Sequence, residues 1–283
     1  MKLFLKLLAL LPLSVLYLLA DILIWIAYHI IGYRTKVVRE NLKNSFPEKT
    51  DAERKKIEKL FYRNLGEIFA ETAYMLSMKK EEFNNRIETA NIDLPLSYLH
   101  QQKSIIVLTG HQGNWEWLLQ GCLVHSPYPI DGVYKKLSSP STDEAMLNLR
   151  TKFGAHLVEM QQVGRELIKR KTLIRSIAMV ADQTPMKDEI QHWVPFLNQD
   201  TGFFVGADKI AGMTGFTVFY VSMHRVKRGH YTLEFHLIQE PPFDKTSFKV
   251  IDRYAELLEA SIRKQPESWL WSHRRWKHNR DKN

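Results

Sequence analysis

From Ser104 onward the sequence alternates between short apolar β-rich runs and helical patterns, and this alternation restricts the possible folds more than any other feature. Because helical patterns separate most of the apolar runs, we predict an α/β fold with a mainly parallel sheet and helices on its faces. The final run alternates in polarity after a Lys-Arg-Gly turn, which predicts an antiparallel hairpin and therefore a mixed sheet. The predicted strands are Ser104–Thr109, Ile130–Tyr134, His156–Met160, Ser176–Ala181, Thr217–His224 and Tyr231–Ile238. The predicted helices between them are Trp115–His125, Thr142–Phe153, Gly164–Lys171 and Gly206–Met213.

The N-terminal segment is a second constraint, because the apolar run Leu7–Ile31 is long enough to cross a bilayer core. A signal peptide is a competing interpretation, but the run exceeds a usual h-region and no small-x-small cleavage site follows it. Asp21 would be costly at the membrane centre, which leaves open a helix lying obliquely in one leaflet. Basic residues flank the run on both sides, so they do not fix its orientation. A buried core helix is the remaining alternative, although such helices rarely run this long.

Helices are also predicted before and after the sheet. Tyr33–Pro47 has the pattern of a short basic amphipathic helix. Thr50 and Glu53 form a capping-box pattern, which predicts a long helix that ends near Met78. A C-terminal helix is expected at Ser247–Lys264. We therefore divide the chain into a membrane anchor, residues 1–32, and an α/β domain, residues 33–283.

The block from Leu108 to Trp117, Leu-Thr-Gly-His-Gln-Gly-Asn-Trp-Glu-Trp, carries the strongest chemical signal. It places His111 at the carboxyl end of a strand, where open α/β sheets bind ligands, and Glu116 in the first turn of a helix capped by Asn114. On one continuous helix the two side chains would point about 140° apart, whereas a glycine-containing turn lets them meet. Glu116 would then accept the imidazole N–H, and His111 would act as a general base. The alternative is a solvated loop histidine and a glutamate that complements the helix dipole.

Polar residues also follow or flank other elements at the same predicted edge of the sheet. Lys135 and Asp182 each follow a predicted strand, and Arg150 lies late in a helix. If the topology converges at this edge, the three side chains would surround His111. Each also has a simpler interpretation: Lys135 as a surface charge, Arg150 as a cation near a helix C-terminus, and Asp182 as a turn residue.

The stretch Pro266–Lys277 interleaves three tryptophans with basic residues, among them Arg274 and Arg275. Aromatic and basic side chains together suit a membrane interface or phosphate groups. They also suit stacking on single-stranded nucleic acid. The alternative is a C-terminal helix that packs its tryptophans on the core and keeps its basic residues in solvent.

The net charge indicates which classes of partner the chain could bind, and the cysteine content indicates its redox compartment. The formal net charge of +9 and the pI near 9.4 favour acidic partners, such as phosphorylated lipids, anionic membranes, acidic proteins or nucleic acid. Cys122 is the only cysteine, so there is neither a disulfide framework nor a zinc-type Cys/His spacing. This composition suits a reducing compartment.

Taken in this order, the motifs resemble those of the bacterial lipid A biosynthesis acyltransferases, the late enzymes that add secondary acyl chains, within the lysophospholipid acyltransferase-like superfamily. The resemblance covers nearly the whole chain and is carried by the apolar N-terminus, Tyr33-Arg-Thr-Lys-Val-Val-Arg-Glu-Asn-Leu, Phe46-Pro47, His111-Gln-Gly-Asn-Trp-Glu116, Val133-Tyr-Lys, Leu149-Arg-Thr-Lys-Phe-Gly, Ala181-Asp-Gln, Val194-Pro-Phe and the block from Pro266 to Lys277. It implies a glycerolipid acyltransferase-like core with an N-terminal membrane helix.

The resemblance also implies site residues. His111 and Glu116 match the catalytic dyad of the family, and Arg150 and Asp182 match positions beside it that bind or orient the substrate. To these we add Lys135, Arg274 and Arg275 as candidate substrate-binding cations. The sequence departs from the family pattern at Lys135, where many members carry Arg, and at Leu197-Asn198, where we would expect Phe-Gly.

The expected reaction is acyl transfer from an acyl-carrier-protein thioester to a hydroxyl group of a lipid A precursor. His111 would deprotonate the hydroxyl, and backbone amides of the Gly110–Gly113 turn, or a cation such as Arg150, would stabilise the oxyanion. No metal and no cofactor beyond the acyl-carrier-protein or acyl-CoA co-substrate is implied.

The expected location is the bacterial inner membrane with the domain on the cytoplasmic face. The expected partners are acyl carrier protein, a membrane lipid acceptor and the anionic membrane surface, without nucleic acid. The acceptor could instead be a lysophospholipid or an aminolipid. Outside the enzymes, the chain could be a basic membrane-associated protein that binds lipid or nucleic acid.

Overall fold

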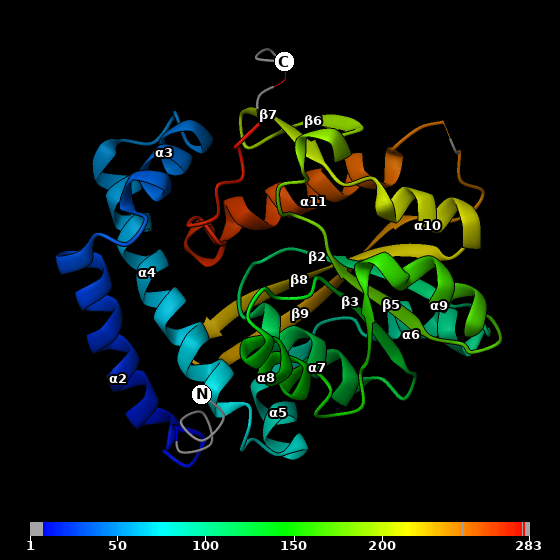
Figure 1. Cartoon of the computed structure of the whole chain (residues 1–283), viewed down its shortest axis with the longest axis horizontal. Coiled ribbons are helices and arrows are strands. Elements are labelled where there is room, and N and C mark those ends of the chain that lie inside the picture. The colour runs from blue at the N-terminus through cyan, green and yellow to red at the C-terminus, as the bar shows by residue number, and fades with distance from the viewer. Residues whose placement is uncertain (1–7, 245, 279, 281–283) are drawn as a thin grey trace.

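The fold is built on a mixed β-sheet, and the computed structural model describes residues 8–244, 246–278 and 280. Within these residues the main sheet has the strand order β1-β9-β8-β2-β5-β3-β4, and a separate ribbon pairs β6 with β7 (Figure 1). The strands of the main sheet are β1 (Ile87–Thr89), β2 (Ile105–Thr109), β3 (Ile130–Tyr134), β4 (His156–Glu159), β5 (Ser176–Val180), β8 (Thr217–Lys227) and β9 (His230–Gln239). The predicted α/β fold with a mainly parallel mixed sheet is confirmed.

The strand pairing creates the edge that the sequence suggested. β2 pairs in parallel with β5 on one side and with β8 on the other, and β3 lies parallel between β5 and β4. β8 and β9 form the predicted antiparallel hairpin, and β1 extends the sheet beyond β9. Because β2, β5 and β3 are adjacent and parallel, their carboxyl ends lie together, and His111, Asp182 and Lys135 follow at this edge.

Two β elements were not predicted. β1 is a three-residue strand, and the ribbon of β6 (His192–Phe196) and β7 (Gln199–Phe203) contains Pro195. A very short strand and a strand with a proline both give weak sequence signals. The ribbon turns at Leu197 and Asn198, which have φ angles of 50° and 61°. This tight turn lies where we expected the Phe-Gly pair.

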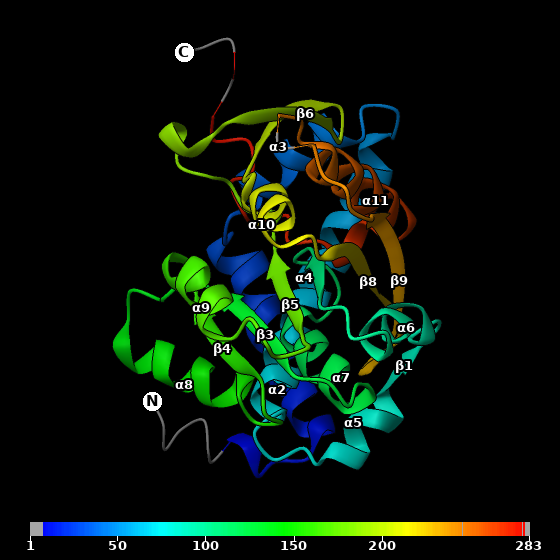
Figure 2. The ribbon, with the colours of Figure 1, turned by 90° about the vertical axis from the view of Figure 1, so that its right-hand side faces the viewer.

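The sheet is covered on both faces, and β2 shows how the sequence divides between them. Ile106 and Leu108 pack in the core under α11, whereas Ile105 and Val107 pack in the opposite core under α7. All five β2 residues are buried, as expected for a strand between two helical layers. The covering helices are α10 (Gly206–Thr214) and α11 (Lys249–Lys264) on one face and α5 (Lys80–Arg86), α6 (Asp93–His100) and α7 (Trp115–His125) on the other. Figure 2 shows α10 and α11 above the sheet, with α8 (Pro140–Arg150) and α9 (Val163–Lys169) on the side of β4.

The helices before the sheet confirm the N-terminal predictions in outline. α3 (Thr35–Ser45) lies within the predicted amphipathic segment. α4 (Asp51–Tyr74) begins at the predicted capping box, in which the backbone N–H of Thr50 donates to Glu53 at 2.7 Å and the Thr50 side chain accepts from the Glu53 backbone. α4 ends before Met78 because a turn at residues 75–77 follows it.

The N-terminal apolar run forms α2 (Leu13–Ile26), which continues as a π-helix to Ile31. By length and composition the segment Leu13–Ile31 could cross a membrane. Figure 1 shows α2 lying alongside α4. One face of α2 is buried against α4, whereas its other face exposes a row of large apolar side chains: Val15, Leu18, Leu19, Ile22, Leu23 and Trp25. Leu7, the first residue of the predicted run, lies outside the described residues.

Candidate active site

The turn between β2 and α7 brings the predicted catalytic residues to the edge of the sheet. A Cβ atom on Gly110 would lie 2.6 Å from Leu258 Cδ1 and 3.2 Å from Asp182 Oδ2, so any larger residue would force Leu258 to shift. Gly113 has a φ of +61°, which a glycine adopts without strain. Asn114 then caps α7, since its side chain accepts a hydrogen bond from the Trp117 backbone N–H at 3.0 Å. The predicted strand, turn and helix are all present.

His111 pairs with Asp182 and not with Glu116. Its Nδ1 atom lies 2.5 Å from Asp182 Oδ1, and its backbone N–H donates to Asp182 Oδ2 at 2.7 Å. Its Nε2 atom lies 3.2 Å from the side-chain nitrogen of Gln183. Both ring nitrogens therefore have partners other than Glu116. The predicted contact is wrong because β2 and β5 are neighbours, which places Asp182 directly beside the turn.

Asp182 is a buried anion held by three donors. Only 2% of it is exposed, and Trp269 Nε1 donates to its Oδ2 at 2.7 Å. Burial by itself would raise the pKa of Asp182, but the charge of His111 and the hydrogen bonds from His111 and Trp269 outweigh it and lower the pKa to about 2. Since an ionised carboxylate only accepts, a proton lies on Nδ1 of His111, and in the neutral imidazole Nε2 is then the acceptor that faces the side-chain nitrogen of Gln183.

Glu116 forms its own pair with Arg150. Arg150 Nε donates to Glu116 Oε2 at 2.9 Å, and Arg150 Nη2 donates to Glu116 Oε1 at 2.6 Å. Burial alone would lower the pKa of Arg150, but the hydrogen bond and charge of Glu116 raise it. This bidentate geometry fixes the guanidinium plane.

These side chains border one cavity of about 540 Å³. His111, Glu116, Arg150 and Lys135 line it at the carboxyl edge of the sheet. The rest of the lining is mostly apolar and reaches the amino ends of the same strands, at Ile105, Ile130 and Ser176, with Leu96, Leu99, Leu118, Leu119 and Val221 along the way. The cavity therefore joins a polar mouth to an apolar interior that runs the length of the strands.

A sequence model for the bacterial lipid A biosynthesis acyltransferases matches residues 2–278. The chain belongs to this family. The resemblance read from the motifs is confirmed, and the chain is an acyltransferase of lipid A biosynthesis, for which the family implies a lipid A precursor and an acyl donor. The non-enzyme alternative is set aside. No individual curated protein matches the sequence. The family and the exposed apolar face of α2 together indicate association with a membrane.

The backbone amides in the turn of this acyltransferase already have partners. The N–H of His111 donates to Asp182, that of Gln112 to Gly110 O at 2.8 Å, and that of Gly113 to Ser268 O at 3.0 Å. The expectation that the Gly110–Gly113 amides hold an oxyanion is therefore wrong for these three groups, because they stabilise the turn itself. Among the groups that we predicted for this role, Arg150 is the cation that borders the cavity.

The C-terminal block Pro266–Lys277 packs against the turn between β2 and α7 and does not form a membrane-interface tail. After a short 3-10 helix, Pro266–Ser268, the chain runs across the turn, where Gln112 and Trp269 form an antiparallel bridge and Leu270 N–H donates to His111 O at 3.1 Å. Trp269 and Trp271 are buried in the core. The alternative in which the tryptophans pack on the core is confirmed, but the predicted helix is not formed.

The two arginines of this block differ in location. Arg275 is 1% exposed; its Nη2 atom donates to Gly202 O at 2.7 Å, and its guanidinium lies 4.4 Å from the centre of the Phe203 ring. Its predicted contact with substrate would require an exposed guanidinium, and this one is enclosed by the core. Arg274 is exposed, so it remains a candidate for binding an anionic group.

Sequence reasoning missed two residues beside the site. Gln183 follows Asp182 and reaches His111, so its place at a strand end was a usable signal. His273 accepts a hydrogen bond from the Thr184 backbone N–H at 3.1 Å, and burial lowers its pKa to about 4. No local pattern links His273 to Thr184, because tertiary packing alone brings them together. Among the described residues, no three His, Cys, Asp or Glu side chains are grouped so that they could hold a metal ion.

Proposed function

We propose that this acyltransferase moves a fatty acyl group from an acyl-carrier-protein thioester to a hydroxyl group of a lipid A precursor, with His111 as the general base. The observation that carries the proposal is the contact between His111 Nδ1 and the ionised carboxylate of Asp182 at the mouth of an apolar cavity. A base beside a polar mouth suits the acceptor hydroxyl, and an apolar interior suits the acyl chain.

The proposed chemistry follows from the tautomer of His111. Asp182 holds the proton on Nδ1, so Nε2 takes the proton of the acceptor hydroxyl as that oxygen attacks the thioester carbon. The new C–O bond forms, the C–S bond breaks, and the thiolate leaves, with the imidazolium as the source of its proton. Asp182 takes the orienting role that we predicted for Glu116.

Glu116 and Arg150 have a different proposed role. Arg150 lines the cavity, and Glu116 fixes its guanidinium by two hydrogen bonds. A fixed cation beside the reacting carbon would stabilise the negative charge that develops on the carbonyl oxygen. Lys135 at the mouth and the exposed Arg274 are candidates for anionic groups of the lipid or of the donor.

The dimensions of the cavity support an acyl chain as its occupant. Its lining reaches from residue 111 to the amino ends of the five-residue strands β2, β3 and β5. Five residues of strand span about 16 Å, so the cavity suits an extended chain of fatty acid length. Cys122 lines it as well, and burial raises the pKa of this thiol to about 12, so the thiol stays protonated.

The proposals for the acyl donor and for the side of the membrane are supported by the charge and the composition of the chain. A net charge of +9 would attract an acidic carrier protein to the membrane surface. One unpaired cysteine and no disulfide framework suit the reducing, cytoplasmic side. A lysophospholipid or an aminolipid remains the second candidate acceptor, because Nε2 of His111 would deprotonate either in the same way.

The decisive experiment compares His111→Ala with His100→Ala, an exposed histidine that does not line the cavity. Purified membranes receive an acyl-carrier-protein thioester and a lipid A precursor without secondary acyl chains, and mass spectrometry follows the product. We expect His111→Ala to lose at least about a hundredfold in rate, with His100→Ala unchanged. A His111→Ala rate within a factor of a few of wild type overturns the proposal. Acylation of phospholipids but not of lipid A favours the second acceptor.

A further inference from the structure

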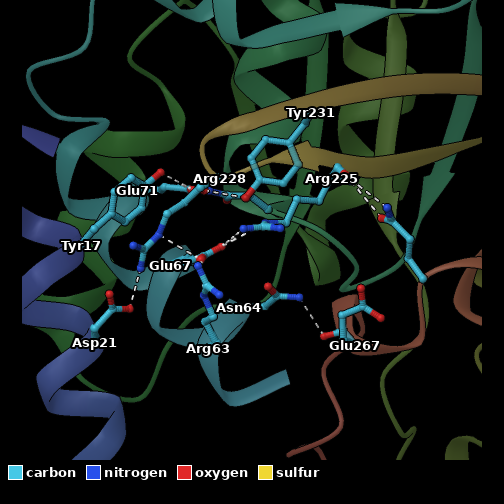
Figure 3. Close-up of polar contacts among 12 residues, drawn as sticks. Tyr17, Asp21, Arg63, Asn64, Glu67, Glu71, Arg225, Arg228, Tyr231 and Glu267 are labelled. Atoms are coloured by element: carbon cyan, nitrogen blue, oxygen red, sulfur yellow. Dashed lines mark hydrogen bonds and ion pairs between the residues drawn. The ribbon is translucent and has the colours of Figure 1, made fainter. Parts of the chain in front are cut away.

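A second set of polar residues, separate from the cavity, is buried between α2, α4 and the β8–β9 hairpin. Glu67 and Glu71 are one helical turn apart on α4, and they are 1% and 0% exposed. Figure 3 shows the two carboxylates between α2 and the β8–β9 hairpin, with Tyr17 and Asp21 approaching from α2. Two adjacent buried carboxylates repel each other unless their surroundings compensate, so their partners reveal what they hold in place.

Glu67 is the centre of an ion cluster that fastens the hairpin and α2 to α4. Arg225 Nη2 lies 2.8 Å from Glu67 Oε2, and Arg228 Nε lies 2.9 Å from Glu67 Oε1. Arg228 also donates to Asp21 Oδ1 at 2.5 Å (Figure 3). Asp21, which would be costly at the centre of a membrane, is thus paired with the hairpin.

Glu71 differs because its side-chain partners are neutral. Its Oε1 accepts from the Tyr17 hydroxyl at 2.7 Å, and its Oε2 accepts from the Tyr231 hydroxyl at 2.8 Å and from Asn114 Nδ2 at 2.6 Å. Burial raises the pKa of Glu71, and the charge of Glu67 raises it further, although the three hydrogen bonds oppose this. The carboxyl is therefore a buried hydrogen-bonding hub that joins three parts of the chain.

Asn114 connects this hub to the active site. The same side-chain amide that donates to Glu71 uses its oxygen to cap α7, at the Trp117 N–H. Trp117 Nε1 in turn donates to the backbone oxygen of Glu71 at 3.0 Å. Asn114 lies between His111 and Glu116 in the turn, so Glu71 fixes the start of the helix that carries Glu116.

Tyr17 is enclosed where it meets the hub. A Cβ on Gly229 would lie 2.6 Å from the Tyr17 hydroxyl, and the Arg228 guanidinium lies 4.1 Å from the centre of the Tyr17 ring. α2 itself sits close to α4, since a Cβ on Gly66 would lie 3.3 Å from Ile24 Cβ. The hydroxyl of Tyr17 therefore reaches Glu71 only while α2 is packed on α4.

We propose that Glu71 is a positioning residue for the catalytic turn and that Tyr17 makes the turn depend on the docking of α2. No residue of α2 lines the cavity, so the helix acts through Glu71 and Asn114 and not by touching substrate. α2 is then more than an anchor, because it completes the support of the active site. This inference rests on the proposed function of His111 only where activity is the readout.

The first test replaces the hub residue in the full-length protein. Glu71→Ala removes the acceptor for Asn114 and should lower kcat about tenfold or more, with little change in KM for the acyl donor. Glu71→Gln should restore most of kcat, since its amide oxygen can accept from Asn114 while its nitrogen donates to the Tyr17 oxygen. The matched control is Glu58→Gln, another buried carboxylate on α4, whose partners are Arg39 and Lys55. Equal kcat losses for Glu71→Ala and Glu58→Gln would contradict the positioning role and show that Glu71 contributes only to general stability.

The second test reads the coupling without any substrate. Gly66→Leu should push α2 from α4, and Tyr17→Phe removes only the hydrogen bond from α2. Hydrogen exchange followed by mass spectrometry should speed up at residues 114–118 in both variants, more in Gly66→Leu, and not in Glu58→Gln. Unchanged exchange at residues 114–118 in Gly66→Leu overturns the coupling even if the protein is an active enzyme. Faster exchange in a protein without acyltransferase activity would instead remove only the proposed function.

Discussion

Asp182 at the sheet edge and Glu71 under α2 are both carboxylates almost wholly excluded from water, yet their pKa values move in opposite directions. Burial opposes the charge in both places. Asp182 overcomes it because its electrostatic interaction with His111 and the N–H groups of His111 and Trp269 favour the carboxylate, whereas Glu71 meets neutral donors and the nearby negative charge of Glu67. Asp182 at the edge of the sheet is thus a charged partner of the proposed catalytic base, whereas Glu71 on α4 is a hydrogen-bonding residue that holds neighbouring segments in place.

Replacing each of the two carboxylates by its amide, in Asp182→Asn and Glu71→Gln, should give the largest difference between them. Asp182→Asn should lower kcat by about a thousandfold, because an amide can donate to Nδ1 and stabilise the wrong tautomer of His111. Glu71→Gln should change kcat by less than about tenfold, since neutral donors do not require a charged acceptor. The measurement is kcat with an acyl-carrier-protein thioester. Similar losses in the two variants would remove the distinction between a charged and a structural carboxylate.

The next largest effect should come from the second ion pair at the edge. Arg150→Lys keeps the positive charge but loses the two parallel hydrogen bonds to Glu116, so we expect about a tenfold loss in kcat with folding intact. Arg263→Lys is a suitable control, because Arg263 pairs with Glu259 on the exposed side of α11. An Arg150→Lys enzyme as active as wild type would show that orientation of the guanidinium is unimportant.

Stability should depend on pH through His273, which supports the loop that carries Asp182. Its folded pKa of about 4 lies below the usual histidine value of 6.5, so the unfolded chain binds more protons between these values. The contribution of neutral His273 is therefore full at pH 7 and is lost as the pH falls from 6.5 towards 4, by at most about 1.4 kcal/mol per pH unit. His273→Gln, whose amide oxygen can accept from Thr184, should unfold with a shallower dependence on pH in this range. Parallel curves of unfolding temperature against pH would refute the assignment.

The smallest effect should be a shift in the preferred acyl chain. Cys122→Met adds volume inside the cavity and should lower the rate with long thioesters severalfold relative to short ones, while leaving the His111–Asp182 pair unchanged. The measurement is the ratio of kcat/KM values for long and short acyl donors. Cys122→Ser serves as the control of similar size. An unchanged ratio would mean that the acyl chain lies elsewhere.

The sequence predicted six of the seven strands of the main sheet, the hairpin, the capping box and Asn114 as the cap of α7, because each of these depends on neighbouring residues. It failed for the partner of His111, because the local spacing pointed to Glu116 whereas the strand order placed Asp182 closer. Strand order is a tertiary property that no periodicity reveals. The burial of Arg275 was missed for the same reason, since the packing of Phe203 and Gly202 against it is not encoded nearby.

The division into an anchor, residues 1–32, and a domain, residues 33–283, stays a prediction. The contacts of α2 join the two predicted parts. Tyr17 and Asp21 bind residues that the division assigns to the domain. The charged residue that complicated a simple membrane span is accounted for by Arg228, which lies more than two hundred positions later in the sequence. A long-range pair of this kind leaves no local signature.

The bridge between Gln112 and Trp269 has a consequence for biosynthesis. The ribosome makes the part of the chain that contains His111 early, but the bridge partner of Gln112 and the indole that donates to Asp182 arrive only when residue 269 has been translated. An emerging chain that ends before Trp269 therefore holds His111 without this support, and we expect it to be inactive toward acyl donors. Nonsense products that stop before Trp269 would be inert, whatever fraction of their helices and strands has formed.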